Sequence, residues 1–235
     1  MIKYGIIIVA GGSSIRMGAG TPKQFLPLGE AERPVLAHTI EKFADTLPQA
    51  RIVVALPPTE TGRWAKLSVK YGVPVHIVCE GGETRFHSVK NALAALGECE
   101  LVAIHDGVRP LVSKELIIKG FEIAETYGTA IPAIRPVDSF RKISEREARQ
   151  AEEVVERSSS PFDRELLRSV QTPQVFRYDI LINAYETGYD PRYTDDAAVV
   201  EAAGTTVTLF PGDPANIKIT NPVDLIVAST LIRHL

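Results

Sequence analysis

The strongest constraint on the fold is a regular alternation between short apolar runs and longer amphipathic stretches. The first run, 5–9, is apolar throughout, which is typical of a strand that is buried on both faces. The predicted strands are 5–9, 51–56, 75–79, 101–104, 130–134 and 206–210. The predicted helices are 35–46, 61–71, 84–96, 114–127, 178–187, 194–203 and about 222–233.

This alternation is the signature of βαβ units, in which helices pack on a parallel sheet. It predicts an α/β fold, a Rossmann-like three-layer sandwich with a mostly parallel sheet. A chain of 235 residues is long enough for one such domain, so a single domain over 1–235 is expected. The last helix should begin after Asn221 as its N-cap, with Pro222 in its first turn.

One segment breaks the alternation. Residues 141–160 are dense in charges of both signs and end in a Ser-Ser-Ser-Pro turn signal. The part 145–156 has the pattern of a solvated helix, but its position between sheet elements equally suits an excursion from the domain body. We therefore expect a protruding arm at about 138–162, whose conformation the pattern leaves open.

The composition excludes several classes of protein. The formal net charge is −3 and no basic block is present, which argues against binding to nucleic acid. No apolar run approaches the roughly 20 residues of a membrane span, and the chain starts without a signal-peptide pattern, so we expect a cytoplasmic protein without a membrane partner. Cys79 and Cys99 have no Cys-x-x-Cys spacing and no His cluster near them, which predicts free thiols rather than a zinc site, with a disulfide as the alternative.

The segment Val9-Ala10-Gly11-Gly12-Ser13-Ser14-Ile15-Arg16-Met17-Gly18 directly follows the first predicted strand. Small residues there let backbone N–H groups approach phosphate oxygens, and Arg16 and Lys23 can add positive charge. The segment lacks the Gly-Lys pair of a P-loop and the Gly-x-Gly-x-x-Gly of a dinucleotide site. We expect a triphosphate to bind here, the alternative being a plain turn with a solvated Arg16.

A second polar cluster, His105-Asp106-Gly107-Val108-Arg109-Pro110, follows the predicted strand 101–104. Ligands of open parallel sheets bind beyond the carboxyl ends of the strands, so this cluster and the glycine segment should share one crevice. Asp106 can hold Mg²⁺ there and Arg109 can contact an anion, unless Asp106 is only a turn or cap residue. His105 is expected to be packed or hydrogen-bonded rather than a metal ligand.

Two further features are ambiguous by themselves. The loop Glu80-Gly81-Gly82-Glu83-Thr84-Arg85 leads into the helix that carries Ser88, an arrangement that suits a nucleobase but also an ordinary strand-to-helix turn. Lys218 interrupts a short apolar stretch, so it either snorkels from an edge strand or points at an anion. Arg164 has the sequence context of a surface residue.

Together these motifs make the chain resemble the 2-C-methyl-D-erythritol 4-phosphate cytidylyltransferases of the non-mevalonate isoprenoid pathway. The glycine segment alone is shared with many nucleotidyltransferases, including molybdenum-cofactor guanylyltransferases. The resemblance is carried in order by the motifs 10–18, Pro22-Lys23-Gln24, Gly81-Gly82-Glu83, 105–110, Gln171-Thr172-Pro173-Gln174 and Asn216-Ile217-Lys218-Ile219-Thr220.

The resemblance implies transfer of CMP from CTP to 2-C-methyl-D-erythritol 4-phosphate, a sugar-alcohol phosphate, with Mg²⁺ as cofactor. It implies these roles: Arg16, Lys23, Arg164 and Lys218 as catalytic residues; Ala10, Gly11, Gly12, Gly82, Glu83 and Ser88 as nucleotide-binding residues; Asp106, Arg109, Ser139, Arg164 and Lys218 as acceptor-binding residues; and Asp106 as a metal ligand.

The family forms homodimers in which the arm of one chain completes the site of its neighbour, so the resemblance implies a homodimer here. The family's arm is a β-hairpin, whereas the pattern of 145–156 is helical, and the family often has Thr where Ser139 stands. Two other functions are compatible with the motifs: ribitol-5-phosphate cytidylyltransferase, or a nucleotide-binding protein without catalysis.

Overall fold

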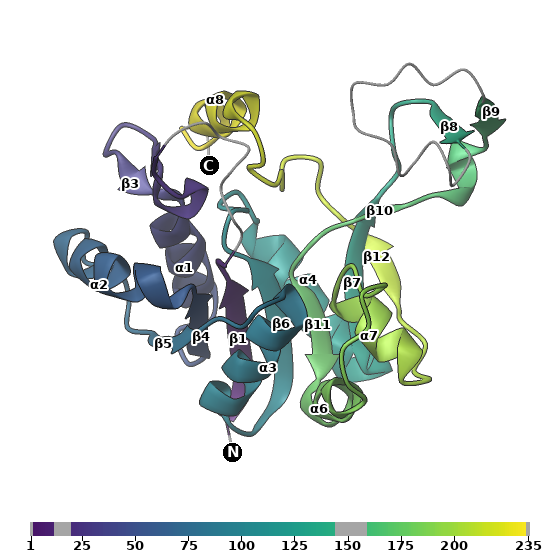
Figure 1. Ribbon diagram of the computed structural model, residues 1–235, viewed down its shortest axis with the longest axis horizontal. Helices are drawn as coiled ribbons and strands as arrows, with labels where there is room; N and C mark the ends of the chain where they lie inside the picture. The colour runs from purple at the N-terminus through teal and green to yellow at the C-terminus, as the bar shows by residue number, and fades with distance from the viewer. Residues whose placement is uncertain (1, 12–19, 144–158, 234–235) are drawn as a thin grey trace.

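The computed structural model describes residues 2–11, 20–143 and 159–233, and its centre is a mixed sheet. Within these residues the sheet has eight strands in the order β10-β7-β11-β6-β1-β4-β5, with β12 also paired to β7 (Figure 1). The strands are β1 (Ile2–Val9), β4 (Arg51–Leu56), β5 (Ile77–Glu80), β6 (Cys99–Asp106), β7 (Thr129–Ile134), β10 (Ser169–Val170), β11 (Gln174–Arg177) and β12 (Leu209–Pro211).

Most of these strands run in the same direction. The pairs β1–β6, β1–β4, β4–β5 and β7–β12 are parallel, while β11 runs antiparallel between β6 and β7. The register of β1 on β6 places Val9 opposite Asp106, so both strands end together at one edge of the sheet. The expected mostly parallel sheet is therefore confirmed.

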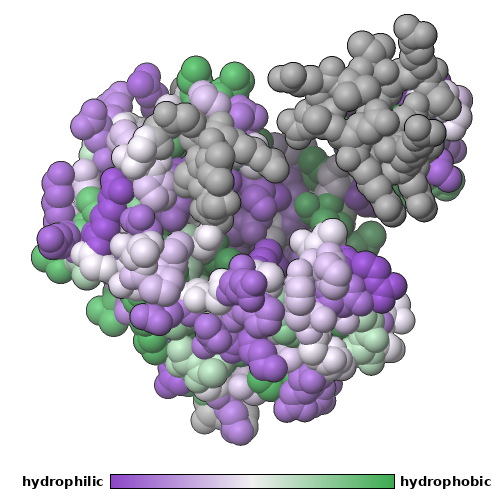
Figure 2. All heavy atoms as spheres, viewed as in Figure 1, coloured by the Kyte–Doolittle hydropathy of each residue, from purple (hydrophilic) through white to green (hydrophobic). Residues whose placement is uncertain are grey.

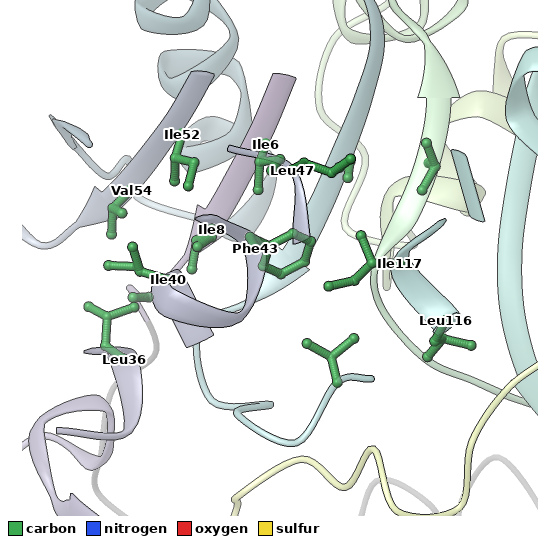
Figure 3. Packing of buried hydrophobic residues seen from close by; sticks show 14 of the residues in the cluster. Ile6, Ile8, Leu36, Ile40, Phe43, Leu47, Ile52, Val54, Leu116 and Ile117 are labelled. Atoms are coloured by element: carbon green, nitrogen blue, oxygen red, sulfur yellow. The ribbon is translucent and has the colours of Figure 1, made fainter. Parts of the chain in front are cut away.

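Helices cover both faces of the sheet and make the three layers that the sequence predicts. Ile6 and Ile8 of β1 pack in one cluster with residues of α1 (Val35–Thr46) and α4 (Lys114–Tyr127) (Figure 3). Ile7 points to the other face, where α3 (Arg85–Leu96), α6 (Tyr178–Glu186) and α7 (Asp196–Ala202) contribute to the second cluster. Since both faces are buried, the strand needs apolar residues at successive positions, which explains its unbroken apolar run.

Further elements lie outside the main sheet. They are the short strands β2 (Pro27–Leu28) and β3 (Arg33–Pro34), α2 (Thr61–Lys70), α8 (Pro222–Leu231) and the 3₁₀ turns η2 (Lys23–Phe25), η3 (Pro58–Glu60) and η4 (Arg164–Leu166). A third apolar cluster joins Leu28 of β2 to Ala228 of α8 and to Val108, just beyond β6. As predicted, Asn221 caps α8, and it forms a capping box with Asp224.

The sequence missed the strands that are shortest. β11 has four residues and β10 has two, too few for a period-two pattern to stand out. β5 begins at Ile77, two residues later than expected, because Val75 is almost fully exposed and belongs to the preceding loop. The strand predicted at 206–210 also begins later than expected, because β12 is Leu209–Pro211 in the structure.

The base of the expected arm is an antiparallel pair of strands. β8 (Phe140–Ile143) pairs with β9 (Ser159–Phe162), and the pair stands apart from the main sheet (Figure 1). The described part of the arm is thus the start of a β-hairpin. The helical pattern of 145–156 lies outside the described residues.

Two further expectations concern the cysteines and the membrane. Both cysteines are free thiols, Cys99 buried and Cys79 partly buried, so the disulfide alternative is wrong. Over the described part of the chain, none of the helices combines the length and the apolar character needed to cross a membrane. The visible face of the molecule mixes hydrophilic and hydrophobic residues (Figure 2).

Candidate active site

A cavity of about 330 Å³ lies at the carboxyl ends of β1 and β6, where the sequence places the ligand crevice. Its volume falls in the range of roughly 300–1,000 Å³ that is usual for small-molecule sites. Eight of the residues assigned from the sequence line it: Ala10, Gly11, Lys23, Gly82, Glu83, Ser88, Asp106 and Lys218.

Two larger hollows lie elsewhere on the molecule. One, of about 590 Å³, lies beside Cys99 at the amino end of β6, and the other, of about 580 Å³, lies beside β7 and β12. Neither is lined by a described residue that the sequence assigned to the site. Size alone would select one of these two hollows, whereas the convergence of the sequence motifs selects the smaller cavity.

The loop after β5 depends on glycine at one position. A Cβ at Gly82 would lie 2.3 Å from the Cβ of His87, which no real side chain tolerates. The Gly82 N–H donates to Ser88 Oγ at 3.0 Å, and the Ser88 hydroxyl donates to the Thr84 carbonyl at 3.0 Å. Ser88 therefore holds the loop in shape, and at Gly11 a Cβ would be 3.8 Å from the same Oγ, so the two glycine segments meet at Ser88.

Asp106 is the centre of charge in the cavity. Its Oδ2 lies 3.2 Å from Arg109 Nε and 3.0 Å from Lys218 Nζ, and its Oδ1 lies 3.9 Å from Arg85 Nε. Burial alone would raise the pKa of Asp106, but the three cations outweigh burial and hold the pKa well below the usual range of a carboxyl. Asp106 is therefore ionised at neutral pH, and the interpretation of Lys218 as a residue directed at an anion is favoured over snorkelling.

His105 supports Asp106 indirectly, through the hydroxyl of Thr172. The Arg109 carbonyl can only accept, so the Nε2 of His105, 3.1 Å away, carries the proton and donates. The other ring nitrogen, Nδ1, then accepts from the Thr172 hydroxyl at 3.0 Å, and Thr172 Oγ1 accepts from the Asp106 N–H at 3.0 Å. His105 is fully buried, which confirms that it is a packed, hydrogen-bonded residue.

Thr172 and Asn216 belong to the site's support, and both come from motifs that the sequence had singled out without a role. Asn216 Nδ2 donates to the Thr172 carbonyl at 2.8 Å, and Arg109 donates to the Asn216 carbonyl at 2.7 Å. Arg109 is thus committed to Asp106 and to the backbone. It braces the carboxylate instead of lining the cavity.

Arg85 is the main residue that the sequence analysis missed. It lines the cavity and donates from both terminal nitrogens to the fully buried Asp196, at 2.7 Å each. Burial would lower the pKa of Arg85, but the charge of Asp196 and its hydrogen bonds raise it instead, so the side chain stays positive. Its position in the glycine loop Glu80–Arg85 was the available signal, whereas its partner 111 residues away could not be read from the sequence.

Other predicted residues lie away from this cavity or outside the description. Ser139 lies at the start of the arm and Arg164 directly follows it, both exposed, with Arg164 bonded to the Val137 carbonyl. Arg16 and Gly12 lie outside the described residues. Within one chain, the described structure therefore joins Lys23, Asp106 and Lys218 but not Arg164.

The donor set fits a magnesium ion that takes few of its ligands from the protein. No group of three or more His, Cys, Asp or Glu that could hold a metal occurs in residues 2–11, 20–143 and 159–233. Mg²⁺ commonly takes only one or two carboxylates and completes its shell with substrate phosphates and water. Asp106, ionised and placed in the cavity, can supply one such carboxylate.

We expect His105 to make stability depend on pH. Burial lowers its pKa to about 4 from the ordinary 6.5, so between these values the unfolded chain binds a proton that the folded chain does not. Stability is then complete above about pH 6.5 and falls by up to about 3 kcal/mol as the pH drops toward 4. Urea unfolding at a series of pH values should show a flatter slope for His105→Gln than for the unaltered protein.

His38, whose pKa is also lowered by burial, provides the comparison. It is less buried than His105, so His38→Gln should remove a smaller part of the slope. Equal slopes for the unaltered protein and His105→Gln would contradict the neutral, buried state of His105.

Comparisons with known proteins identify the family of this chain. The sequence profile of the family described as IspD, 2-C-methyl-D-erythritol 4-phosphate cytidylyltransferase, matches residues 4–234. The enzyme of that name from Bacteroides thetaiotaomicron is 43% identical over 232 residues, covering 98% of this chain and 100% of the relative. Its counterpart from Bacteroides fragilis is 44% identical over 227 residues, 96% of this chain and 98% of the relative.

Solved structures give the same result. The crystal structure of 2-C-methyl-D-erythritol 4-phosphate cytidylyltransferase from Thermus thermophilus aligns with a TM-score of 0.75 at 32% identity, covering 98% of this chain and 99% of the other. That from Francisella tularensis aligns with a TM-score of 0.78 at 29% identity, covering 97% and 99%. The chain belongs to the 2-C-methyl-D-erythritol 4-phosphate cytidylyltransferase family.

Proposed function

We propose that this chain transfers CMP from CTP to 2-C-methyl-D-erythritol 4-phosphate, giving 4-diphosphocytidyl-2-C-methyl-D-erythritol and pyrophosphate. The family match over residues 4–234 supports the reaction. The observation that carries the proposal is the convergence of Lys23, Asp106 and Lys218 with two glycine segments on one cavity. These residues come from motifs far apart in the sequence, and the fold brings them to one edge of the sheet.

The chemistry requires charge neutralisation more than a base. An oxygen of the acceptor phosphate attacks the α-phosphorus of CTP, a new P–O bond forms, and the bond to the β-phosphate oxygen breaks with its electron pair leaving on pyrophosphate. A phosphomonoester has a second pKa of about 6, so near neutral pH it is already a competent nucleophile. The barrier lies in the repulsion between two anions and in the charge on the leaving oxygens, which preorganised cations offset.

The cations divide between the two substrates. Lys23, with Arg16, is proposed to hold the triphosphate, while the backbone at Ala10, Gly11 and Gly12 approaches it closely. Lys218 is proposed to hold the acceptor phosphate. An ammonium has three N–H donors, so Lys218 can keep its contact with Asp106 at 3.0 Å and still donate to a phosphate oxygen.

The nucleobase is proposed to bind at the loop between β5 and α3. Gly82 leaves room for a flat ligand edge, Glu83 lines the cavity, and Ser88 fixes the loop. Mg²⁺ bound beside Asp106 would neutralise charge on the phosphates of CTP. The protein's own contribution there is an ionised carboxylate braced by Arg109.

We propose a homodimer in which the arm completes the neighbouring site. Arg164 and Ser139 are exposed on their own chain, which is consistent with a role toward a second copy. Val137 and Leu166 beside the arm are exposed as well, at 84% and 76%, and offer apolar surface for the contact. A cytoplasmic location is part of the same proposal, because CTP is a cytoplasmic metabolite.

The reaction is tested by measuring pyrophosphate release with CTP, UTP, ATP and GTP in the presence of Mg²⁺ and methylerythritol phosphate. We expect release with CTP to exceed that with the other three nucleotides. Ribitol 5-phosphate in place of the acceptor tests the related cytidylyltransferase. Release only with ribitol 5-phosphate would assign that activity instead, and no release with either acceptor would favour a non-catalytic nucleotide-binding protein.

The two lysines should affect different steps. Lys23→Ala should lower kcat by roughly 10³-fold, because it removes positive charge where the transition state becomes more anionic. Arg16→Ala should act in the same way. Lys218→Ala should chiefly raise KM for the acceptor phosphate. Steady-state kinetics check this division, and a Lys23→Ala enzyme with nearly normal turnover would remove that residue from the mechanism.

The arm is tested by combining two damaged chains. Co-expression of Arg164→Ala chains with Lys23→Ala chains yields mixed dimers in which one site has both an intact body and an intact arm. If the arm acts on its neighbour, activity should recover to about a quarter of the unaltered level, because half of the dimers are mixed and each has one complete site. Recovery should be absent when each variant is expressed alone. Absence of recovery in the mixture would place Arg164 in its own chain's site.

A further inference from the structure

Asp196 is a fully buried carboxylate at the start of α7, and among the described residues Arg85 lines the cavity while Asp196 does not. Its two oxygens accept from Arg85 Nη1 and Nη2 at 2.7 Å each, and Oδ1 also accepts from the Tyr185 hydroxyl at 2.7 Å. A buried charge needs such partners, and this arrangement satisfies it well. It also fixes the direction of the Arg85 guanidinium.

Arg85 lies between two carboxylates but forms hydrogen bonds with only one. Its Nε is 3.9 Å from Asp106 Oδ1, which is too long for a hydrogen bond. The other oxygen of Asp106 has close partners in Arg109 and Lys218. In the part of the chain that the structure describes, Oδ1 accepts no hydrogen bond.

Asp106 and Asp196 both lie close to the Arg85 guanidinium. Arg85 Nε already lies 3.9 Å from Asp106 Oδ1, so a small turn of a released Arg85 side chain would bring an N–H donor within hydrogen-bond distance of that oxygen. The start of α7 is held by Gln174, whose Nε2 donates to Asp195 at 2.8 Å and whose Oε1 accepts from the Ala197 N–H at 3.0 Å. Asp196 is therefore a fixed anchor.

Tyr185 strengthens the anchor from α6. It is buried, and its ring stacks on Phe86, the neighbour of Arg85 in the sequence, with centroids 4.6 Å apart. The hydroxyl thus binds Asp196, while the ring packs on the residue next to Arg85. The pair spans α3 and α7 on the face of the sheet opposite α1.

We propose that Asp196 and Tyr185 are positioning residues that keep the Arg85 guanidinium hydrogen-bonded to Asp196. Asp106 Oδ1 is then left for the divalent cation that accompanies the nucleotide. The inference rests on the proposed function, because it takes the cation to lie at Asp106. Carboxylate oxygen is the ligand that Mg²⁺ prefers, and a hydrogen bond from Arg85 would occupy it. Arg85 then adds positive charge to the cavity without blocking its central carboxylate.

The test measures how strongly Mg²⁺ and CTP favour each other's binding, using calorimetric titration of CTP in Mg²⁺ and in EDTA without acceptor. The ratio of the two dissociation constants is the coupling factor. Relative to the unaltered protein, Asp196→Asn should reduce this factor by about tenfold or more, because Arg85 is released to Asp106. Tyr185→Phe should reduce it less.

The decisive variant is the double substitution Arg85→Gln with Asp196→Asn. It replaces the ion pair with two neutral amides and removes the guanidinium that would close on Asp106, so the coupling factor should return toward the unaltered value. Thermal unfolding of each variant checks that it is folded. A merely structural role of Asp196 would give no such recovery.

Four outcomes would overturn the proposal. Unchanged coupling in Asp196→Asn would show that the anchor is unnecessary, and a double variant that behaves like Asp196→Asn would show that Arg85 is not the blocking group. An equal loss of CTP affinity in EDTA would show that the oxygen serves the nucleotide itself. Asp106→Asn with unchanged coupling would remove the cation from Asp106, and that result identifies the failure as one of the proposed function.

Discussion

The parallel pairing of β1 with β6 is the interaction on which the site depends. Its register sets Val9 opposite Asp106, and the Gly107 N–H continues the ladder by donating to the Val9 carbonyl at 2.8 Å. The first glycine segment and the central carboxylate therefore leave the sheet side by side. A shift of one residue would turn Asp106 toward the other face and bury its charge among apolar side chains. The apolar clusters on both faces hold this register.

Around this pairing the protein holds several positively charged side chains close together. Arg85, Arg109 and Lys218 all lie within 4 Å of Asp106, and a fourth cation, Lys23, lines the same cavity. Two of the cations near Asp106 have a further partner that fixes their role: a buried carboxylate for Arg85 and a backbone carbonyl for Arg109. Such preorganisation suits the binding of two anionic substrates, because the cations need little rearrangement when charge develops.

Much of the site could be predicted because its residues lie in short segments with clear physical signals. Gly82 is required by a 2.3 Å approach to His87, and a glycine pair after a strand already suggested a close approach. Asp106 followed an apolar run, which placed it at the ligand edge of the sheet. Arg85, Thr172 and Asn216 were harder, since their roles depend on partners more than 40 residues away.

The sequence by itself determined the alternation of strands and helices, the burial of β1 on both faces and the position of Asp106 directly after a buried strand, since apolar periodicity and order along the chain are local properties. Only the tertiary structure decided that Ser88 supports a loop, that Arg109 braces Asp106, and that Arg85 is held by Asp196. It also decided that β11 runs antiparallel in the middle of the sheet. These features arise from contacts between distant segments, and a local pattern carries no information about which distant group will satisfy a buried charge or donor.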